Sequence, residues 1–337
     1  MVKAGFKWMF LILGTMIGAG YASGRELWQF FGQESALAII LFTTLIIIST
    51  LVVMTISYNH KTIHYMPALE ALLGKRFSGL YDGMIILYLF STTVIMLAGG
   101  GASLVVIGLP NWLGISFIST CLILLFIWGN KGMVSMSTVV IPILIVLLVG
   151  VLVKFIQTTE NVMAVNWLRQ SNWPSAFTFT ALNILPLVAV ISAVGRDIKG
   201  KGEIWIASIG SGLILGAISF LYNQSLLKIT HEIILYEIPL FGLLKAYPHA
   251  MTIIMSALLW FAIYTTAASG IFGLVTRFRH VLRLPLWCLS LIAVILMLPL
   301  TTLGFSKLIG ILYPIYGFLN LYLLAAILIY PIMHRFD

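Results

Sequence analysis

Charged side chains are scarce in this sequence of 337 residues. Asp, Glu, Lys and Arg make up 9% of the chain, whereas a soluble domain carries about a quarter. Hydrophobic side chains make up 61%, which is more than a water-soluble fold can bury. The composition therefore indicates an integral membrane protein with the lipid bilayer as its solvent.

Cysteine is also scarce, and Cys121 and Cys288 each lie inside an apolar stretch. A thiol in such a stretch packs as a small hydrophobe, so we expect no disulfide and no metal centre. The net charge of +9 does not indicate nucleic acid as a partner, because the basic residues gather in short segments between apolar stretches. The N-terminus runs directly into an apolar stretch without a small-residue cleavage pattern, so we expect no removable signal peptide.

Ten apolar stretches follow one another, each bounded by charge, Gly or Pro. They cover residues 5–31, 35–58, 79–109, 112–129, 134–156, 174–195, 203–227, 249–276, 284–302 and 308–333. A membrane helix needs about 20 apolar residues, so the sequence predicts a single transmembrane domain over residues 1–337 with ten helices. Basic residues are more frequent on the side of the two termini, among them Arg196, Lys199, Lys201 and Arg277. This bias predicts a multi-pass protein of the cell inner (plasma) membrane with both termini in the cytoplasm.

The ten spans divide into two halves of five, at about residues 5–156 and 174–333. Since five is odd, the second half enters the membrane with inverted topology, which is typical of secondary transporters. The first span of each half carries helix-breaking residues at mid-depth: three glycines in one half, and the stretch from Asn183 to Pro186 in the other. The predicted architecture is an all-α inverted repeat with broken helices one and six.

The three glycines of the first span are Gly14, Gly18 and Gly20, and each costs a helix about 1 kcal/mol relative to Ala. A broken helix is tolerated in a bilayer only where the freed amides and carbonyls face protein or a polar cavity. Such a break offers carbonyl oxygens to a cation and amide groups to an anion. The alternative is close helix packing, for which Gly14 and Gly18 have the usual spacing.

The run from Gly14 to Tyr21, GTMIGAGY, resembles the first-span signature of the amino acid, polyamine and organocation (APC) transporter superfamily. The stretch from Arg196 to Gly200 resembles the charged loop that follows span six in that superfamily. Within it, the chain is similar to the YkvI-type bacterial membrane proteins. The resemblance implies the LeuT-type fold and a secondary active transporter, in the first place a sodium-coupled symporter of an amino acid or similar small zwitterion.

Span eight extends the resemblance, because its segment FAIYTT, which ends at Thr266, is similar to the sodium-site segment of the family. The resemblance implies that the Ala262 carbonyl and two hydroxyls, which share one helical face, bind sodium together with two carbonyls of the first span. Five oxygens suit a hard cation. The implied ligands are Gly14, Ile17, Ala262, Thr265 and Thr266. The alternative is that the hydroxyls bond to carbonyls one turn earlier, as is common in membrane helices.

The same resemblance places the substrate between the breaks of spans one and six, against spans three and eight. Its carboxylate would meet the amides after Gly18 and Gly20, and its amine the carbonyls near Thr15 and Asn183. Tyr21 stands where an Asn of a second sodium site would be expected, which favours one sodium. The implied substrate-binding residues are Thr15, Gly18, Ala19, Gly20, Ser91, Thr92, Asn183, Leu185, Pro186 and Tyr264.

Proton coupling is an alternative to sodium coupling. Ionisable residues inside a membrane span are functional candidates, and the sequence places none at mid-depth, which favours sodium. Arg25 and Glu26 are interpreted as a solvated pair at the outer end of the first span, with Glu26 as a gate or protonatable group in the alternative interpretation.

Enzyme signatures are missing from the sequence, which has no nucleophile elbow, no metal-ligand cluster and no paired carboxylates. We therefore expect no enzyme activity, and no cofactor other than sodium as the coupling ion. The remaining alternatives are an amino-acid-sensing membrane receptor similar to spore germination subunits, and a channel or membrane-embedded lipid enzyme.

Overall fold

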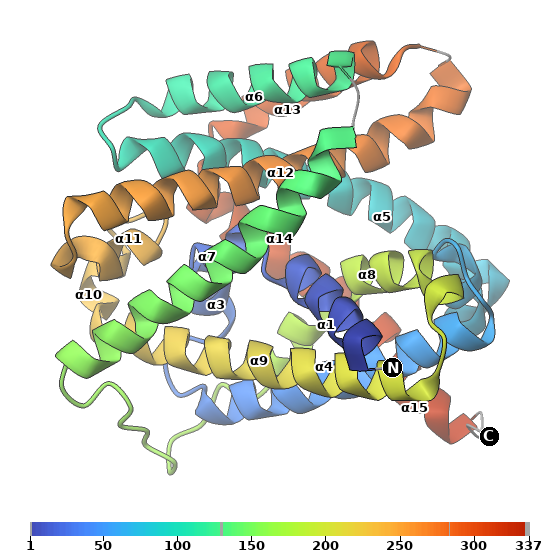
Figure 1. The fold of residues 1–337 in the computed structure, drawn as a ribbon, viewed down its shortest axis with the longest axis horizontal. Coiled ribbons are helices and arrows are strands. Elements are labelled where there is room, and N and C mark those ends of the chain that lie inside the picture. Colours follow the sequence, from blue (N-terminus) through green and yellow to red (C-terminus); the bar gives the residue numbers. More distant parts are fainter. Residues whose placement is uncertain (1, 129–130, 283, 334–337) are drawn as a thin grey trace.

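The chain folds into a bundle of helices in which the two ends of the chain lie on the same side (Figure 1). The structure is a computed structural model that describes residues 2–128, 131–282 and 284–333. Among these residues there are helices and connecting segments but no β-strand. The expected all-α architecture is therefore confirmed.

The helices up to residue 158 form the first five expected spans. They are α1 (Val2–Met16), α2 (Ala19–Ala22), α3 (Arg25–Phe30), α4 (Ala36–Asn59), α5 (Met66–Val105), α6 (Asn111–Trp128) and α7 (Lys131–Thr158). The rest of the chain forms α8 (Ser175–Ala193), α9 (Lys201–Lys228), α10 (Thr230–Ile233), α11 (Leu240–Leu243), α12 (His249–Leu282), α13 (Leu286–Thr301), α14 (Phe305–Leu319) and α15 (Leu321–Met333). Two short 3₁₀ turns cover Gly195–Asp197 and Leu244–Ala246.

Seven helical stretches in the described part of the chain are long and apolar enough to cross a membrane. They are Ala36–Asn59, Met66–Val105, Val140–Thr158, Ser175–Ala193, Lys201–Lys228, His249–Phe278 and Phe305–Met333. The helices α6 and α13 are apolar but shorter, and the first span falls short because it is divided into α1, α2 and α3. The count of ten crossings stays a prediction.

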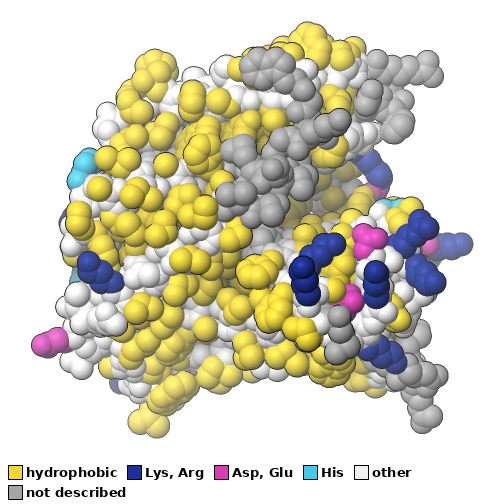
Figure 2. Space-filling model, viewed as in Figure 1, with side chains coloured by type: hydrophobic (Ala, Val, Ile, Leu, Met, Phe, Trp, Pro, Cys, Tyr) yellow, Lys and Arg dark blue, Asp and Glu magenta, His cyan; other side chains and the backbone are white. Residues whose placement is uncertain are grey.

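The surface has the distribution that a bilayer requires. The face in Figure 2 is mostly hydrophobic, and charged side chains gather towards its right side, where both termini lie in Figure 1, with fewer on the left, where α10 and α11 lie. Exposed apolar side chains such as Leu87, Phe117 and Val146 would be costly in water over so large an area. The middle of the molecule therefore faces lipid.

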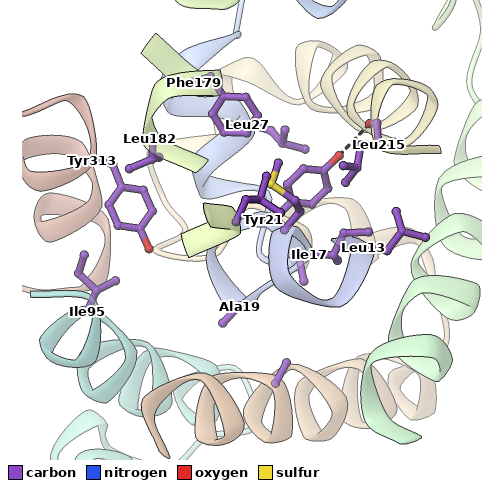
Figure 3. Close-up of a cluster of buried hydrophobic side chains, with 14 of the residues drawn as sticks. Leu13, Ile17, Ala19, Tyr21, Leu27, Ile95, Phe179, Leu182, Leu215 and Tyr313 are labelled. Atoms are coloured by element: carbon purple, nitrogen blue, oxygen red, sulfur yellow. Dashed lines mark hydrogen bonds between the residues drawn. The ribbon is translucent and has the colours of Figure 1, made fainter. Parts of the chain in front are cut away.

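The interior is built from helices that are distant in sequence. α1 packs against α9, α4 against α8 and α9, and α5 against α12. The short helix α2 lies inside this arrangement, and Ile17, Ala19 and Tyr21 around it are fully buried (Figure 3). The Tyr21 hydroxyl donates to the Leu215 carbonyl of α9 at 3.0 Å. The first span is thus held at the centre of the molecule rather than on its surface.

Candidate functional site

The first span is broken between α1 and α2. The Ile17 amide makes the last bond to α1, at 2.7 Å from the Leu13 oxygen, and the next amide that donates to a backbone carbonyl is that of Ala22, at 2.9 Å from the Gly18 oxygen. Gly18 has the extended angles φ −84° and ψ −173°. The break leaves the amides of residues 18–21 and the carbonyls of Gly14 and Ile17 without their helical partners. The predicted break in span one is confirmed.

The glycines of the break have different neighbours. A Cβ atom on Gly14 would lie 3.9 Å from Ile141, and one on Gly18 would lie 3.9 Å from the Thr266 hydroxyl, which are ordinary contacts. A Cβ atom on Gly20 would lie 2.1 Å from Oε1 of Glu26, so a larger residue there would require the Glu26 carboxyl to move. Close helix packing therefore does not explain Gly14 and Gly18.

Close packing by glycine occurs elsewhere in the molecule, between α4 and α9. A Cβ atom on Gly212 would lie 2.2 Å from Ile47, and one on Gly216 would lie 2.0 Å from the Thr43 hydroxyl. Small residues let these two helices approach each other. The contrast with Gly14 and Gly18 favours the break, rather than packing, as the reason for the glycines in span one.

The proposed sodium ligands of α12 lie against the break. α12 packs against α2, and Thr266 is the neighbour of Gly18. The hydroxyls of Thr265 and Thr266 both donate to the Ala262 carbonyl, at 3.1 and 2.8 Å. This is the bonding that the alternative interpretation expects. It also gathers three oxygens at one place, and one of them, the Thr266 hydroxyl, lies beside Gly18. A hydroxyl that donates to a carbonyl still has lone pairs that can face a cation.

Most of the predicted substrate residues lie on α1, α5 and α8. The Thr15 hydroxyl donates to the Leu11 carbonyl at 2.8 Å, and the Thr92 hydroxyl donates to the Tyr88 carbonyl at 2.7 Å. Ser91 of α5 shares a hydrogen bond of 2.6 Å with Tyr316 of α14. The helices α1 and α5 both pack against α8, which carries Asn183, Leu185 and Pro186.

The prediction of a second break, between Asn183 and Pro186 in span six, is wrong. α8 runs without interruption from Ser175 to Ala193, with Pro186 inside it. Asn183 is buried, and its Nδ2 donates to the Phe179 carbonyl one turn earlier, at 2.8 Å. Pro186 has no amide hydrogen for the Leu182 carbonyl. α8 therefore frees a single carbonyl, because the packing of neighbouring helices holds the rest of it in helical form.

Tyr264 lies away from the break, contrary to the sequence-based expectation. Its hydroxyl donates to the Cys121 carbonyl of α6 at 3.2 Å, and its ring stacks on Trp260 at 5.5 Å. Both rings line an apolar cavity of about 500 Å³ between α5, α6 and α12. On α12, Thr266 lies beside Gly18 of the first span, whereas Tyr264 faces α6.

Arg25 and Glu26 are not the solvated pair that the sequence suggested, since each is 8% exposed. The Arg25 guanidinium donates to the carbonyls of Tyr236, and of Glu237 at 3.1 Å. The Glu26 carboxyl turns back towards Gly20 and faces the Tyr313 hydroxyl within hydrogen-bonding range. The sequence did contain a signal for this buried carboxyl: Glu26 is a charged residue inside the apolar stretch of residues 5–31, six positions after Gly20.

No family model matches the chain. The chain is 48% identical over 333 residues to YyaD of Bacillus subtilis (strain 168), an uncharacterized protein, with 99% of this chain and 98% of YyaD covered. It is 23% identical over 330 residues to YkvI of the same organism, an uncharacterized membrane protein, with 95% of this chain and 94% of YkvI covered. The expected similarity to YkvI-type proteins is confirmed.

Solved structures of transporters share the fold. MhsT in complex with L-phenylalanine matches with a TM-score of 0.69 and 14% identity over 97% of this chain and 88% of MhsT. A manganese transporter of Eremococcus coleocola matches with a TM-score of 0.57 and 14% identity over 96% and 74%. A Na⁺-coupled sialic acid symporter matches with a TM-score of 0.52 and 12% identity over 98% of both chains. The fold is therefore of the LeuT type, and these neighbours are transporters rather than enzymes.

Proposed function

We propose that this chain, which belongs to the same family as YyaD of Bacillus subtilis, is a secondary active transporter that works by alternating access around the break in the first span. The single observation that carries the proposal is the break at Ile17 and Gly18, which leaves backbone donors and acceptors unpaired at the buried centre of the molecule. Unpaired backbone groups at membrane depth are stable only where a ligand or cavity can satisfy them. The LeuT-type fold supports the same function.

Sodium is the coupling ion that we propose. The freed carbonyls of Gly14 and Ile17 and the three oxygens of Ala262, Thr265 and Thr266 would provide an oxygen-only shell. Supporting this assignment, Thr266 lies beside Gly18, and both hydroxyls point at the Ala262 carbonyl. A Na⁺-coupled sialic acid symporter is among the proteins of similar fold.

An amino acid or similar small zwitterion is the substrate that we propose. Its carboxylate would meet the unpaired amides of Gly18, Ala19 and Gly20, and α8 would offer the Leu182 carbonyl, freed by Pro186, to its amine. Apart from the Glu26 carboxyl beside Gly20, the surrounding side chains are apolar or hydroxyl-bearing, which favours a substrate with a neutral side chain. L-Phenylalanine, the ligand of MhsT, is the first compound to test.

For orientation, we propose that the chain lies in the plasma membrane with both termini in the cytoplasm. The two ends lie on the same side of the bundle, and charged side chains gather there (Figures 1 and 2). Basic residues accumulate on the cytoplasmic side of membrane proteins. A cysteine added to the N-terminus of the protein tests this orientation. A membrane-impermeant thiol reagent should label it in inverted vesicles and not in intact cells.

The decisive experiment uses the purified protein in liposomes. A thermal-shift screen of amino acids in sodium and in potassium first selects a ligand, starting from L-phenylalanine. The labelled ligand should then accumulate above its external concentration when an inward sodium gradient is imposed, and equal sodium on both sides should abolish accumulation. Binding without accumulation would instead favour the receptor, and flux that does not saturate would favour a channel.

A further inference from the structure

Glu26 lies beside Gly20 at the centre of the molecule, and its carboxyl group has no role in the proposed sodium or substrate site. It lies on α3, directly after the break, and is 8% exposed. Its Oε1 atom fills the space above Gly20, where a Cβ atom would be 2.1 Å away. A carboxyl group buried at this depth needs a partner for its charge or a proton to neutralise it.

No cation of the described part of the chain pairs with Glu26. The described ion pairs are Lys245 with Glu232 and Arg277 with Asp82. Arg25, the neighbour in sequence, is held by the carbonyls of Tyr236 and Glu237. The carboxyl group is therefore surrounded by neutral groups.

The titratable groups that face Glu26 are tyrosines from several elements. Tyr313 of α14 lies within hydrogen-bonding range of the carboxyl group, and Tyr88 of α5 and Tyr21 of α2 are close enough to interact with its charge. Tyr222 of α9 packs against Gly24, next to α3, and α8 contributes no titratable residue. Figure 3 shows Tyr313 directed towards this central region.

Polar groups continue from Tyr313 along α14 towards the side of the termini. Tyr316 lies one turn further on and shares a hydrogen bond with Ser91 at 2.6 Å. Asn320 follows after another turn, is fully buried, and has neither amide atom hydrogen-bonded. Residues spaced by three and four lie on one helical face. Together they form a row of hydroxyl and amide groups between Glu26 and the end of α14.

We propose that Glu26 is a proton-binding site, and that a proton moves with the substrate in each transport cycle. This proposal rests on the proposed transport function. The carboxylate takes a proton from external water, forming the O–H bond when the site is open outwards, and gives it to cytoplasmic water when the site opens inwards. The hydroxyls of Tyr313 and Tyr316 lie along the second path, and a hydroxyl can both donate and accept.

The geometry favours a proton over the amine of a substrate as the partner of Glu26. One carboxyl oxygen lies against Gly20, with no room for a methyl group between them. The other side of the carboxyl group faces Tyr313. An ammonium group needs space and several acceptors, whereas a proton needs only the oxygen.

The test compares the wild type with Glu26→Gln in detergent, without substrate. A carboxyl group that binds a proton in the folded protein, and not in the unfolded chain, makes the folded state less stable as the pH rises. We expect the melting temperature of the wild type to fall as the pH rises from about 5 to about 9. The melting temperature of Glu26→Gln should fall less over the same range. Glu70→Gln, which changes an exposed carboxyl group on α5, is the matched control and should keep the wild-type slope.

A second readout keeps the proposal testable where Glu26→Gln fails to fold. Infrared difference spectroscopy of the wild type between the two pH limits should show a protonated carboxyl band, and Tyr313→Phe should shift it because the Tyr313 hydroxyl faces the group. Equal slopes in the wild type and Glu26→Gln, or a wild type without the band, overturn the proposal.

A third measurement separates the proton from the substrate amine. With the ligand from the thermal-shift screen, Glu26→Gln should bind as the wild type does, but liposomes with an internal pH indicator should lose substrate-driven acidification. Loss of binding at every pH would overturn the proposal in favour of the amine. Because the first two readouts use no substrate, failure of sodium-driven uptake leaves them valid, and their failure leaves the transport proposal standing.

Discussion

The first span and α8 both contain residues that disfavour a helix in their middle. The first span leaves helical geometry at Gly18 and resumes it as α2 and α3, whereas α8 continues through Pro186. Intrinsic propensity does not explain the difference, since three glycines cost about 3 kcal/mol in total and one proline costs about the same. The two segments differ in what surrounds them.

Polar groups meet the backbone of the first span at its break. The Thr266 hydroxyl lies beside Gly18, and the Glu26 carboxyl lies against Gly20. In α8, Asn183 uses its own side chain on the Phe179 carbonyl, and Leu185 and Leu187 are buried in apolar surroundings. In this protein, the span that breaks has polar groups beside its backbone, and the span that stays continuous is surrounded by apolar side chains.

The largest expected effect follows from a bulky side chain in the break. Gly18→Leu should abolish substrate uptake, because the side chain would fill the space between Gly18 and Thr266, while the protein still inserts and purifies as a monodisperse species. Gly14→Ala, whose Cβ atom would only touch Ile141, is the matched control and should retain uptake in liposomes. Normal uptake by Gly18→Leu would favour the packing interpretation of the glycines.

Alanine at two positions of the break should distinguish the effect of steric crowding from that of helix propensity. Gly20→Ala pushes against the buried Glu26 carboxyl and should destabilise the protein by about 2 kcal/mol, the middle of the range for overpacking. Gly18→Ala meets the Thr266 hydroxyl at 3.9 Å and should change stability by less than about 0.5 kcal/mol. Thermal unfolding in detergent measures both. Because propensity favours Ala over Gly at both positions, equal losses would mean that contact with the Glu26 carboxyl does not decide the effect.

Removal of the Thr265 and Thr266 hydroxyls on α12 should abolish the stabilisation of the protein by sodium. With sodium at ten times its dissociation constant, binding stabilises the wild type by about 1.4 kcal/mol, and the double variant Thr265→Ala, Thr266→Ala should lose this gain. Thr276→Ala is the control: it removes a hydroxyl that donates to the Phe272 carbonyl on the same helix and should keep the stabilisation by sodium. Melting temperatures in sodium and potassium chloride provide the measurement, and the sodium proposal fails when the wild type melts alike in both salts.

The smallest effect is expected in α8. Pro186→Ala restores a donor to the Leu182 carbonyl and should stabilise the protein by about 1 kcal/mol, less than the ~3 kcal/mol of propensity, because the neighbouring helices already hold α8 together. The same change should weaken substrate binding by occupying that carbonyl. Pro299→Ala in α13 is the control, with no effect on binding. Unchanged binding by Pro186→Ala would remove α8 from the substrate site.

Periodic and local features were predictable from the sequence. The apolar stretches gave helix positions such as 174–195 for α8, which covers Ser175–Ala193, and the glycine run located the break at Ile17 and Gly18. These features depend on hydrophobicity and on residues close in sequence. The LeuT-type fold was implied by the resemblance of the run from Gly14 to Tyr21 to a transporter signature.

Features that depend on contacts between distant helices were not predictable. The orientation of Tyr264 depends on the Cys121 carbonyl of α6, and the burial of Glu26 depends on Tyr313, almost 300 positions away. The continuity of α8 depends on the helices that pack around it. In each case tertiary contacts decide the outcome, and single-sequence patterns carry no information about them.

The connection between α9 and α12, which lies on the side of the molecule opposite the termini (Figure 1), has a mechanical consequence. Its backbone is tied to the first span by Arg25 and by the bond of 3.0 Å from the Leu240 amide to the Ser23 carbonyl, and its Glu237 carboxylate accepts from the Phe305 amide of α14 at 2.9 Å. A movement that separates any two of these three elements strains the third. We expect this side of the molecule to open in one concerted step, and not by the gradual loss of single contacts.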